Sequence, residues 1–188
     1  MISARDTYFN FIELIKSIPF TPFHLGPGFL IGMIFKRWVN LASILVASVI
    51  VDIRTTYCFF TGCYPLHGPF HTFLGATILS LVVIIGIYAF RSQIEQILGF
   101  FKIKQDYSLQ SIVAGAVFGI WIHIILDAFL YPEMFPFWPA LGNPLIGIID
   151  SGTVYNFCIM GFVVGGVIYI YNIYKENLRQ DERALTES

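Results

Sequence analysis

The chain has 188 residues, of which 56% are hydrophobic and 12% charged, with a mean hydropathy of +0.73 and a formal net charge of −1. So few charges cannot solvate a globule of this size, and the composition therefore predicts one integral membrane domain. Clustered Lys and Arg are absent, which excludes nucleic acid as a partner and leaves membrane lipid as the expected surroundings.

The first twenty residues mix Arg5, Asp6, Glu13 and Lys16 with aromatic side chains. They lack the clean apolar core of a cleavable signal peptide, so we expect residues 1–20 to form an amphipathic helix at the membrane interface. Residues 21–174 are the predicted membrane domain. Residues 175–188 are predicted to be a polar cytoplasmic tail.

Apolar stretches follow at Phe23 to Phe35, Leu41 to Ile53, Phe73 to Phe90, Ile112 to Tyr131 and Val154 to Tyr174. The last three approach the roughly 20 residues that a spanning helix needs, whereas the first two have about 13 each and are expected to end inside the bilayer. The predicted fold is all-α. It is a polytopic bundle of about five hydrophobic helices, two of them short, with Gly161, Gly165 and Gly166 at close helix contacts.

Basic residues separate the loops into two sets. Lys and Arg lie between the first two stretches, between the third and fourth, and in the tail. The loop from Asp52 to Phe70 has only Arg54, and the loop from Pro132 to Thr153 has none. The positive-inside rule then predicts a multi-pass cell-membrane protein with a cytoplasmic tail and with these two loops outside.

The three cysteines form no zinc motif. Cys58 and Cys63 are close enough to form a disulfide if their loop lies outside the cell, whereas Cys158, in an apolar run, is expected to be a buried thiol.

All four histidines fall where hydrophobic segments begin or end. His123 and Asp127 lie four residues apart in WIHIILDAF and therefore share one face of a helix. In PLHGPFHT, Pro69 should start a helix, which brings His67 and His71 close together. Alternation of the five stretches through the membrane brings these residues, with His24 and Asp52, to the extracytoplasmic ends of their segments.

Each part of this pattern also has a plainer interpretation. The His123 and Asp127 pair could simply hold helices together, and His67 and His71 could be interfacial residues. Asp52 and Arg54 could be solvated at the interface, although a guanidinium also binds phosphate oxygens in bidentate fashion.

Imidazole nitrogen combined with carboxylate oxygen suits zinc first, with manganese or iron as alternatives. Six such side chains are more than one tetrahedral ion takes, so we expect one ion with supporting residues, or two ions. A metal-bound hydroxide would then hydrolyse a phosphoryl or carbonyl compound, with Asp52 and Asp127 as the catalytic candidates. The sequence contains no nucleophile elbow, Walker loop or H-E-x-x-H motif that would indicate other chemistry.

HLGPG, Asp52, HGPFHT and HIILD, in this order, resemble the family of predicted membrane-bound metal-dependent hydrolases of archaea and bacteria. The resemblance runs from about Phe20 to about Tyr174. That family is thought to be distantly similar to zinc-dependent phospholipases C and related single-strand nucleases, which implies an all-helical fold and phosphoester hydrolysis. By this resemblance the metal ligands are His24, Asp52, His67, His71, His123 and Asp127. Gly68 stands where the commoner family motif has Arg, and Thr72, a candidate substrate contact beside Arg54, stands where it has Ser.

The leading hypothesis is therefore hydrolysis of a phospholipid or a related phosphoester, because recessed ligands are more easily reached by an amphiphile than by a soluble nucleotide. A second hypothesis is a non-catalytic metal-binding or transport protein. It requires polar residues that continue toward the cytoplasmic side. The third is a structural membrane protein in which the histidines bind no metal. A homo-oligomer is compatible with each of them.

Overall fold

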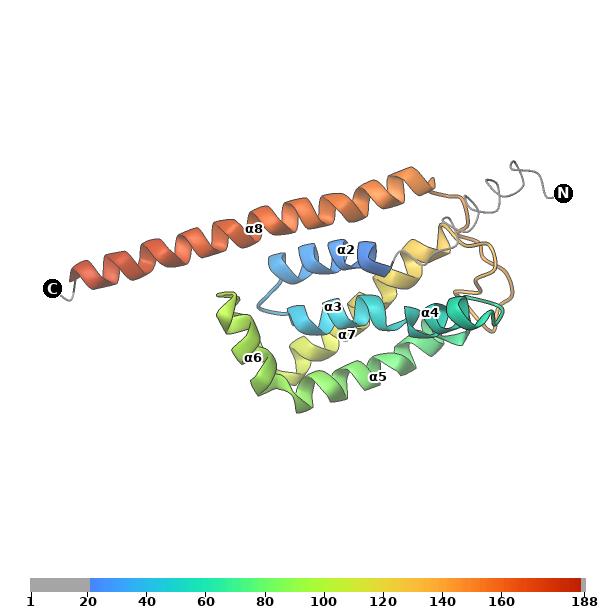
Figure 1. The fold of residues 1–188 in the computed structure, drawn as a ribbon, viewed down its shortest axis with the longest axis horizontal. Helices are drawn as coiled ribbons and strands as arrows, with labels where there is room; N and C mark the ends of the chain where they lie inside the picture. Colours follow the sequence, from blue (N-terminus) through green and yellow to red (C-terminus); the bar gives the residue numbers. More distant parts are fainter. Residues whose placement is uncertain (1–20, 187–188) are drawn as a thin grey trace.

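The computed structural model describes residues 21–186, which form an all-helical bundle as the sequence predicts (Figure 1). The predicted interfacial helix over residues 1–20 lies outside this range. The described helices are, in chain order, α2 (Thr21–Ile34), α3 (Leu41–Ile50), α4 (Asp52–Thr61), the short 3₁₀ helix η1 (Pro69–His71), α5 (Phe73–Ala89), α6 (Arg91–Phe100), α7 (Leu109–Ala128) and α8 (Ser151–Thr186).

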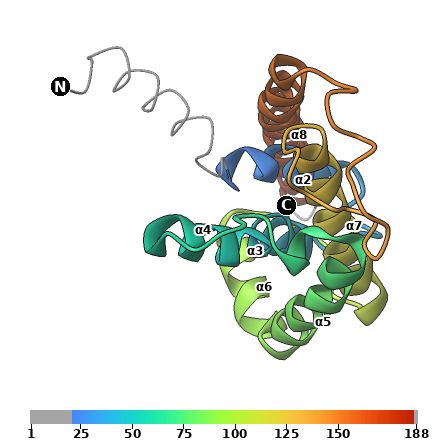
Figure 2. The same cartoon turned by 90° about the vertical axis from the view of Figure 1, so that its right-hand side faces the viewer.

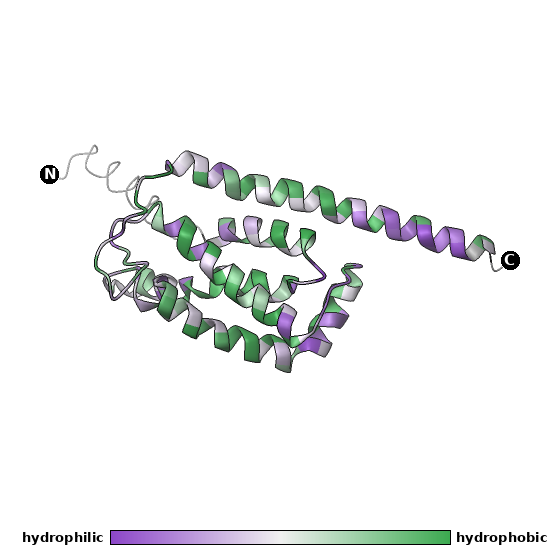
Figure 3. Ribbon diagram, turned by 180° about the vertical axis from the view of Figure 1, so that it is seen from behind, coloured by the Kyte–Doolittle hydropathy of each residue, from purple (hydrophilic) through white to green (hydrophobic). Residues whose placement is uncertain are grey.

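Three of these segments are long and apolar enough to cross a membrane: Leu41–Thr61, Leu109–Ala128 and Ser151–Arg183. A fourth span is added if α5 and α6 are counted together, although the chain bends by 73° between them. The apolar helix Pro22–Ile34 is shorter. The predicted count of about five hydrophobic helices is thus approximately right, and the ribbon in Figure 3 shows where hydrophobic residues lie along these helices.

The prediction that the second apolar stretch is short and ends near Ile53 is wrong. Val51 keeps helical backbone angles, so α3 continues into α4 and the span has 21 residues. At 1.5 Å per residue, Asp52 lies about 16 Å from Leu41 and about 14 Å from Thr61. Asp52 is therefore near the middle of this continuous helical segment and not at its end.

Helix α4 continues past Asp52 because its polar side chains face the protein interior and its apolar side chains face outward, the reverse of a helix on the surface of a water-soluble protein. It buries Asp52, Thr55 and Cys58, whereas Ile53, Tyr57 and Phe60 are exposed. A helix with its polar stripe inside and its apolar stripe outside suits lipid and not water. Figure 2 shows the far end of α4 standing out from the bundle on the side away from α7.

Glycines allow α2 and α8 to pack with their backbones in contact. A Cβ atom added at Gly161 would lie 2.5 Å from the carbonyl carbon of Gly26, and one at Gly165 would lie 2.7 Å from the Phe29 ring. The predicted packing role is confirmed for these two glycines. It is wrong for Gly166, where a Cβ would meet nothing within 4 Å.

The segments that connect the helices lie at two opposite ends of the bundle. Residues 62–72 and 129–150 lie at the right-hand end in Figure 1, and the turn before α3 and helix α6 lie at the left-hand end. Helix α8 runs unbroken to Thr186, so the predicted polar tail is helical as far as that residue, and the sequence of the helix becomes polar toward its end (Figure 3). The end that carries the loops 62–72 and 129–150 is where the candidate site lies.

Candidate metal centre

Asp52, His71, His123 and Asp127 form one buried cluster. One donor atom from each lies within 4.8 Å of the others. Ligands bound to one ion at 2.0 to 2.2 Å are at most about 4.4 Å apart, so a small contraction would let all four bind a single cation. The four residues come from three parts of the chain: the α3–α4 junction, η1 and α7.

The i, i+4 spacing in α7 places the His123 and Asp127 side chains together as predicted, with Nε2 of His123 3.0 Å from Oδ2 of Asp127. Asp52 approaches from the neighbouring span. Its Oδ1 lies 3.4 Å from the same Nε2 and 3.1 Å from Nε2 of His71. Two carboxylates and two imidazoles thus share a volume from which water is excluded.

The hydrogen bond made by Nδ1, the other ring nitrogen of His123, indicates that a cation would stabilise the cluster. Nδ1 donates a hydrogen bond to the Ser48 carbonyl oxygen at 2.8 Å, and a carbonyl can only accept. In the neutral ring Nε2 therefore carries a lone pair and can only accept a hydrogen bond. The atoms nearest to it are carboxylate oxygens, which can only accept as well. The 3.0 Å contact with Oδ2 of Asp127 is a hydrogen bond only when Nε2 carries a proton. A cation among these atoms would remove the repulsion, and a backbone carbonyl on the far ring nitrogen is the usual support of a metal-bound histidine.

His71 reaches the cluster because the chain turns sharply just before α5. Pro69 begins the 3₁₀ turn, Thr72 caps α5 by accepting from the Gly75 N–H, and His71 is held between them, 1% exposed. Burial lowers the pKa of His71, so the ring is neutral near pH 7 and has a lone pair available for a metal.

His24 adjoins the cluster through Asp127. Its Nε2 lies 3.0 Å from Oδ1 of Asp127, and its ring centroid is 4.2 Å from that of His123. It is buried, but it is not among the four residues whose donor atoms all lie close together. Whether it binds a metal directly stays a prediction.

His67 also adjoins the cluster, and it has a partner that the sequence did not indicate. Its ring meets that of His71 edge-on at 4.8 Å, stacks on Tyr131 at 4.1 Å, and donates from Nδ1 to Oε1 of Glu133 at 2.6 Å. This hydrogen bond lowers the pKa of Glu133. Glu133 lies in the loop after α7, where no regular spacing links it to His67.

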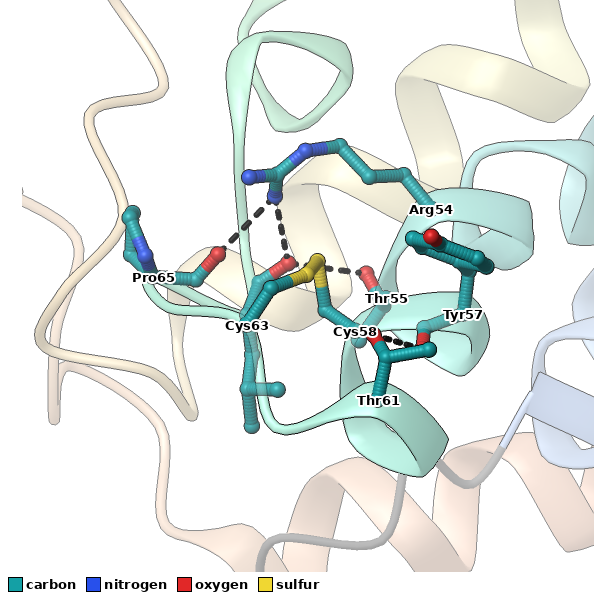
Figure 4. The surroundings of a disulfide bond; sticks show 8 residues. Arg54, Thr55, Tyr57, Cys58, Thr61, Cys63 and Pro65 are labelled. Atoms are coloured by element: carbon teal, nitrogen blue, oxygen red, sulfur yellow. Dashed lines mark hydrogen bonds between the residues drawn. A yellow bond between two sulfur atoms is a disulfide. The ribbon is translucent and has the colours of Figure 1, made fainter.

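Arg54 and Thr72, the two candidate substrate contacts, have structural roles in this arrangement. Nη1 of Arg54 donates to the carbonyl oxygens of Pro65 and Leu66, at 2.9 and 3.0 Å, and so fastens the 62–68 loop onto α4 (Figure 4). The guanidinium covers Gly68, where any Cβ would collide with it. The Thr72 hydroxyl donates a hydrogen bond to the Pro69 carbonyl oxygen and accepts one from the Gly75 N–H.

The same loop contains the disulfide that the sequence left open. Cys58 and Cys63 are joined, one at the end of α4 and the other just after it (Figure 4). Cys158 is a buried free thiol, as predicted. The disulfide and Arg54 together fix the segment that leads to His67 and His71.

Comparisons of the chain with protein family models, with curated proteins and with solved structures find no match. Fold and site geometry therefore carry the functional argument, and together they describe an all-helical membrane protein whose buried Asp and His cluster could bind a divalent metal.

Proposed function

We propose that this protein is an integral membrane metal-dependent hydrolase that cleaves a phosphoester of a lipid or another amphiphile. The observation that carries the proposal is the orientation of His123, whose Nδ1 bond to Ser48 turns Nε2 toward two carboxylates that cannot donate to it. The motifs that resemble the membrane-bound hydrolase family lead to the same expectation.

The donor set favours a borderline divalent ion, zinc first and manganese or iron as alternatives. When bound, such an ion polarises a phosphoryl oxygen and makes water a nucleophile near neutral pH. Asp52, His71, His123 and Asp127 would hold it, with His24 supporting Asp127. In the reaction, the oxygen of water bonds to phosphorus, the bond from phosphorus to the leaving oxygen breaks, and one of the two carboxylates passes the proton of water to that oxygen.

The buried polar residues further along the bundle give less support to the transport alternative. Ser43 donates to the Ile112 carbonyl, and Ser48 donates to the Ile44 carbonyl. Ile44 and Ile120 are fully buried among these helices. Hydroxyls that are already bonded to backbone, with apolar side chains around them, offer a cation no continuous path.

The test is metal content and hydrolysis of bis(p-nitrophenyl) phosphate and of phospholipid by the full chain in detergent. We expect about one or two ions per chain, and Asp127→Asn should lose both metal and hydrolysis. Asp150→Asn is the matched control, because Asp150 is an exposed carboxylate that caps α8 through Thr153. Hydrolysis that survives in Asp127→Asn, or that is absent from metal-loaded wild type, would contradict the proposal.

A further inference from the structure

A cavity of about 710 Å³ lies beside the metal centre, on the far side of the His67 ring. Its size is within the range of about 300 to 1,000 Å³ that is typical of small-ligand sites. Among the described residues that line it, His67 and Glu133 are the only ionisable side chains apart from the phenol of Tyr64. Because the ring of His67 also meets that of His71, one imidazole separates this cavity from the four-residue cluster.

The walls of the cavity are mostly apolar and come from three segments. Leu74 and Ile78 of α5 form one side, Phe135 and Trp138 of the 129–150 loop form another, and Tyr64 and Pro65 lie across from them. The loop is fixed against α5 by a hydrogen bond from the Phe73 N–H to the Pro136 carbonyl and by the contact of the Phe73 and Phe137 rings. The cavity therefore belongs to the fold and does not depend on a chance loop position.

One face of α5 is not covered by any other described helix. The α5 side chains that line the cavity lie on this same face. Helix α5 packs inward through Ala76, Ser80, Val83 and Ile87, and it exposes Leu74, Ile78, Leu81 and Ile85. In a bilayer these exposed side chains contact lipid tails, so the lipid-facing surface leads directly into the cavity. Exposed Tyr64 and Trp138 at its rim are residues that prefer the depth of the headgroups.

We propose that this cavity holds the hydrocarbon chain of a single-chain amphiphile, which enters sideways from the bilayer past Leu74 and Ile78 and places its polar end against His67. That this polar end is a phosphoester rests on the proposed function. It specifies the substrate further, because the chain and not only the headgroup is recognised.

The experiment uses the full chain in lipid nanodiscs and dodecyl phosphate with a terminal diazirine as the probe. Leu74→Trp and Ile78→Trp narrow the cavity. Leu81→Trp and Ile85→Trp are matched controls, since each lies seven residues further along the same face, with 55% and 69% exposure against 50% and 61% for Leu74 and Ile78. We expect photolabelling to concentrate on cavity residues and to fall at least fivefold in the two cavity variants, while the two controls label as wild type does.

A second measurement compares hydrolysis of dodecyl and ethyl p-nitrophenyl phosphate. The ratio of the two kcat/KM values should exceed ten in wild type and in both controls, and it should fall at least fivefold in the cavity variants. Labelling spread evenly along α5, or a ratio near one, would overturn the cavity proposal even if hydrolysis occurs. Cavity labelling without any hydrolysis would support the cavity proposal and contradict the hydrolase.

Discussion

His24 on α2 lies 3.0 Å from Asp127 on α7, Nε2 to Oδ1, and both side chains are almost fully buried. This contact depends on the position of α2, which packs against α8 through Gly26 and Gly161. The packing of α2 against α8 therefore influences the position of His24 beside the candidate metal centre.

Gly161→Ala should therefore weaken both the fold and the site. The added methyl meets the Gly26 backbone, and overpacking of this kind costs about 1–3 kcal/mol. Gly166→Ala is the control, since its methyl meets nothing and alanine favours a helix by up to about 1 kcal/mol. Thermal unfolding in detergent and metal content measure the two effects. Equal stability of the two variants would contradict the packing argument.

Metal removal should destabilise the protein, because an ion bound only to the folded state stabilises it by mass action. Zinc at 100 times its dissociation constant should add about 2.7 kcal/mol to the metal-free protein. The measurement is the unfolding temperature after chelation and after zinc is restored. Asp127→Asn should show little response to zinc, and a wild-type protein indifferent to chelator would argue against the centre.

The sequence predicted the helical class and the residues of this centre better than it predicted their depth. The spacing of His123 and Asp127 determined their contact, because four residues make about one helical turn. Asp52 was expected to end a short helix because a charge usually marks an interface. Here, however, the partners that make its burial tolerable, His71 and His123, come from other parts of the chain, and local hydropathy cannot reveal them.

Glu133 shows the same limit for a loop residue. No periodicity relates it to His67, and only the folded positions of the 62–68 and 129–150 loops bring the two together. An acidic residue in a loop predicted to lie outside the cell was the available signal, and it does not identify a partner, since Asp150 in the same loop gives the same signal.

Glu133→Ala should release His67 and lower hydrolysis about tenfold or more, with Glu133→Gln restoring part of the rate because its amide oxygen still accepts from Nδ1. Metal content distinguishes the roles of His67. A fall of about 10- to 100-fold in metal affinity is the expected cost of losing the support of a ligand. Full metal content with reduced hydrolysis would leave His67 only the substrate contact of the cavity proposal. Unchanged rates in the alanine variant would show that the pair has no functional role.

Metal binding should weaken as the pH falls through the pKa of His71, which lies below the ordinary value of 6.5. Burial lowers the pKa of His71 beneath its ordinary value of 6.5, so the folded state favours the neutral ring. That contribution to stability is complete above pH 6.5 and is lost as the pH falls through the lower folded-state pKa. Asp52, Asp127, His123 and His67 face this ring. Metal titrations at pH 7.5, 6.5 and 5.5 test the direction, and constant affinity would contradict it.

The two loops that flank the site are predicted to be extracytoplasmic. After mild reduction, Cys63 should react in intact cells with a maleimide that cannot cross membranes, whereas Cys58 and Cys158, which are both buried, should not. Loss of this disulfide, which closes a loop of only a few residues, should cost about 2 kcal/mol. Labelling of Cys63 only after cell lysis would reverse the orientation.

The order of the ligands along the chain also has a consequence for biogenesis. Asp52 enters the membrane with the span that contains it before His123 and Asp127 have been synthesised. A carboxylate at mid-span is unfavourable in lipid until a partner arrives. The nascent chain must therefore keep that span beside the translocation machinery, or another polar surface, until α7 is inserted. A metal held by these residues would correspondingly be loaded late in the maturation of the protein, after the last of these helices has joined the bundle.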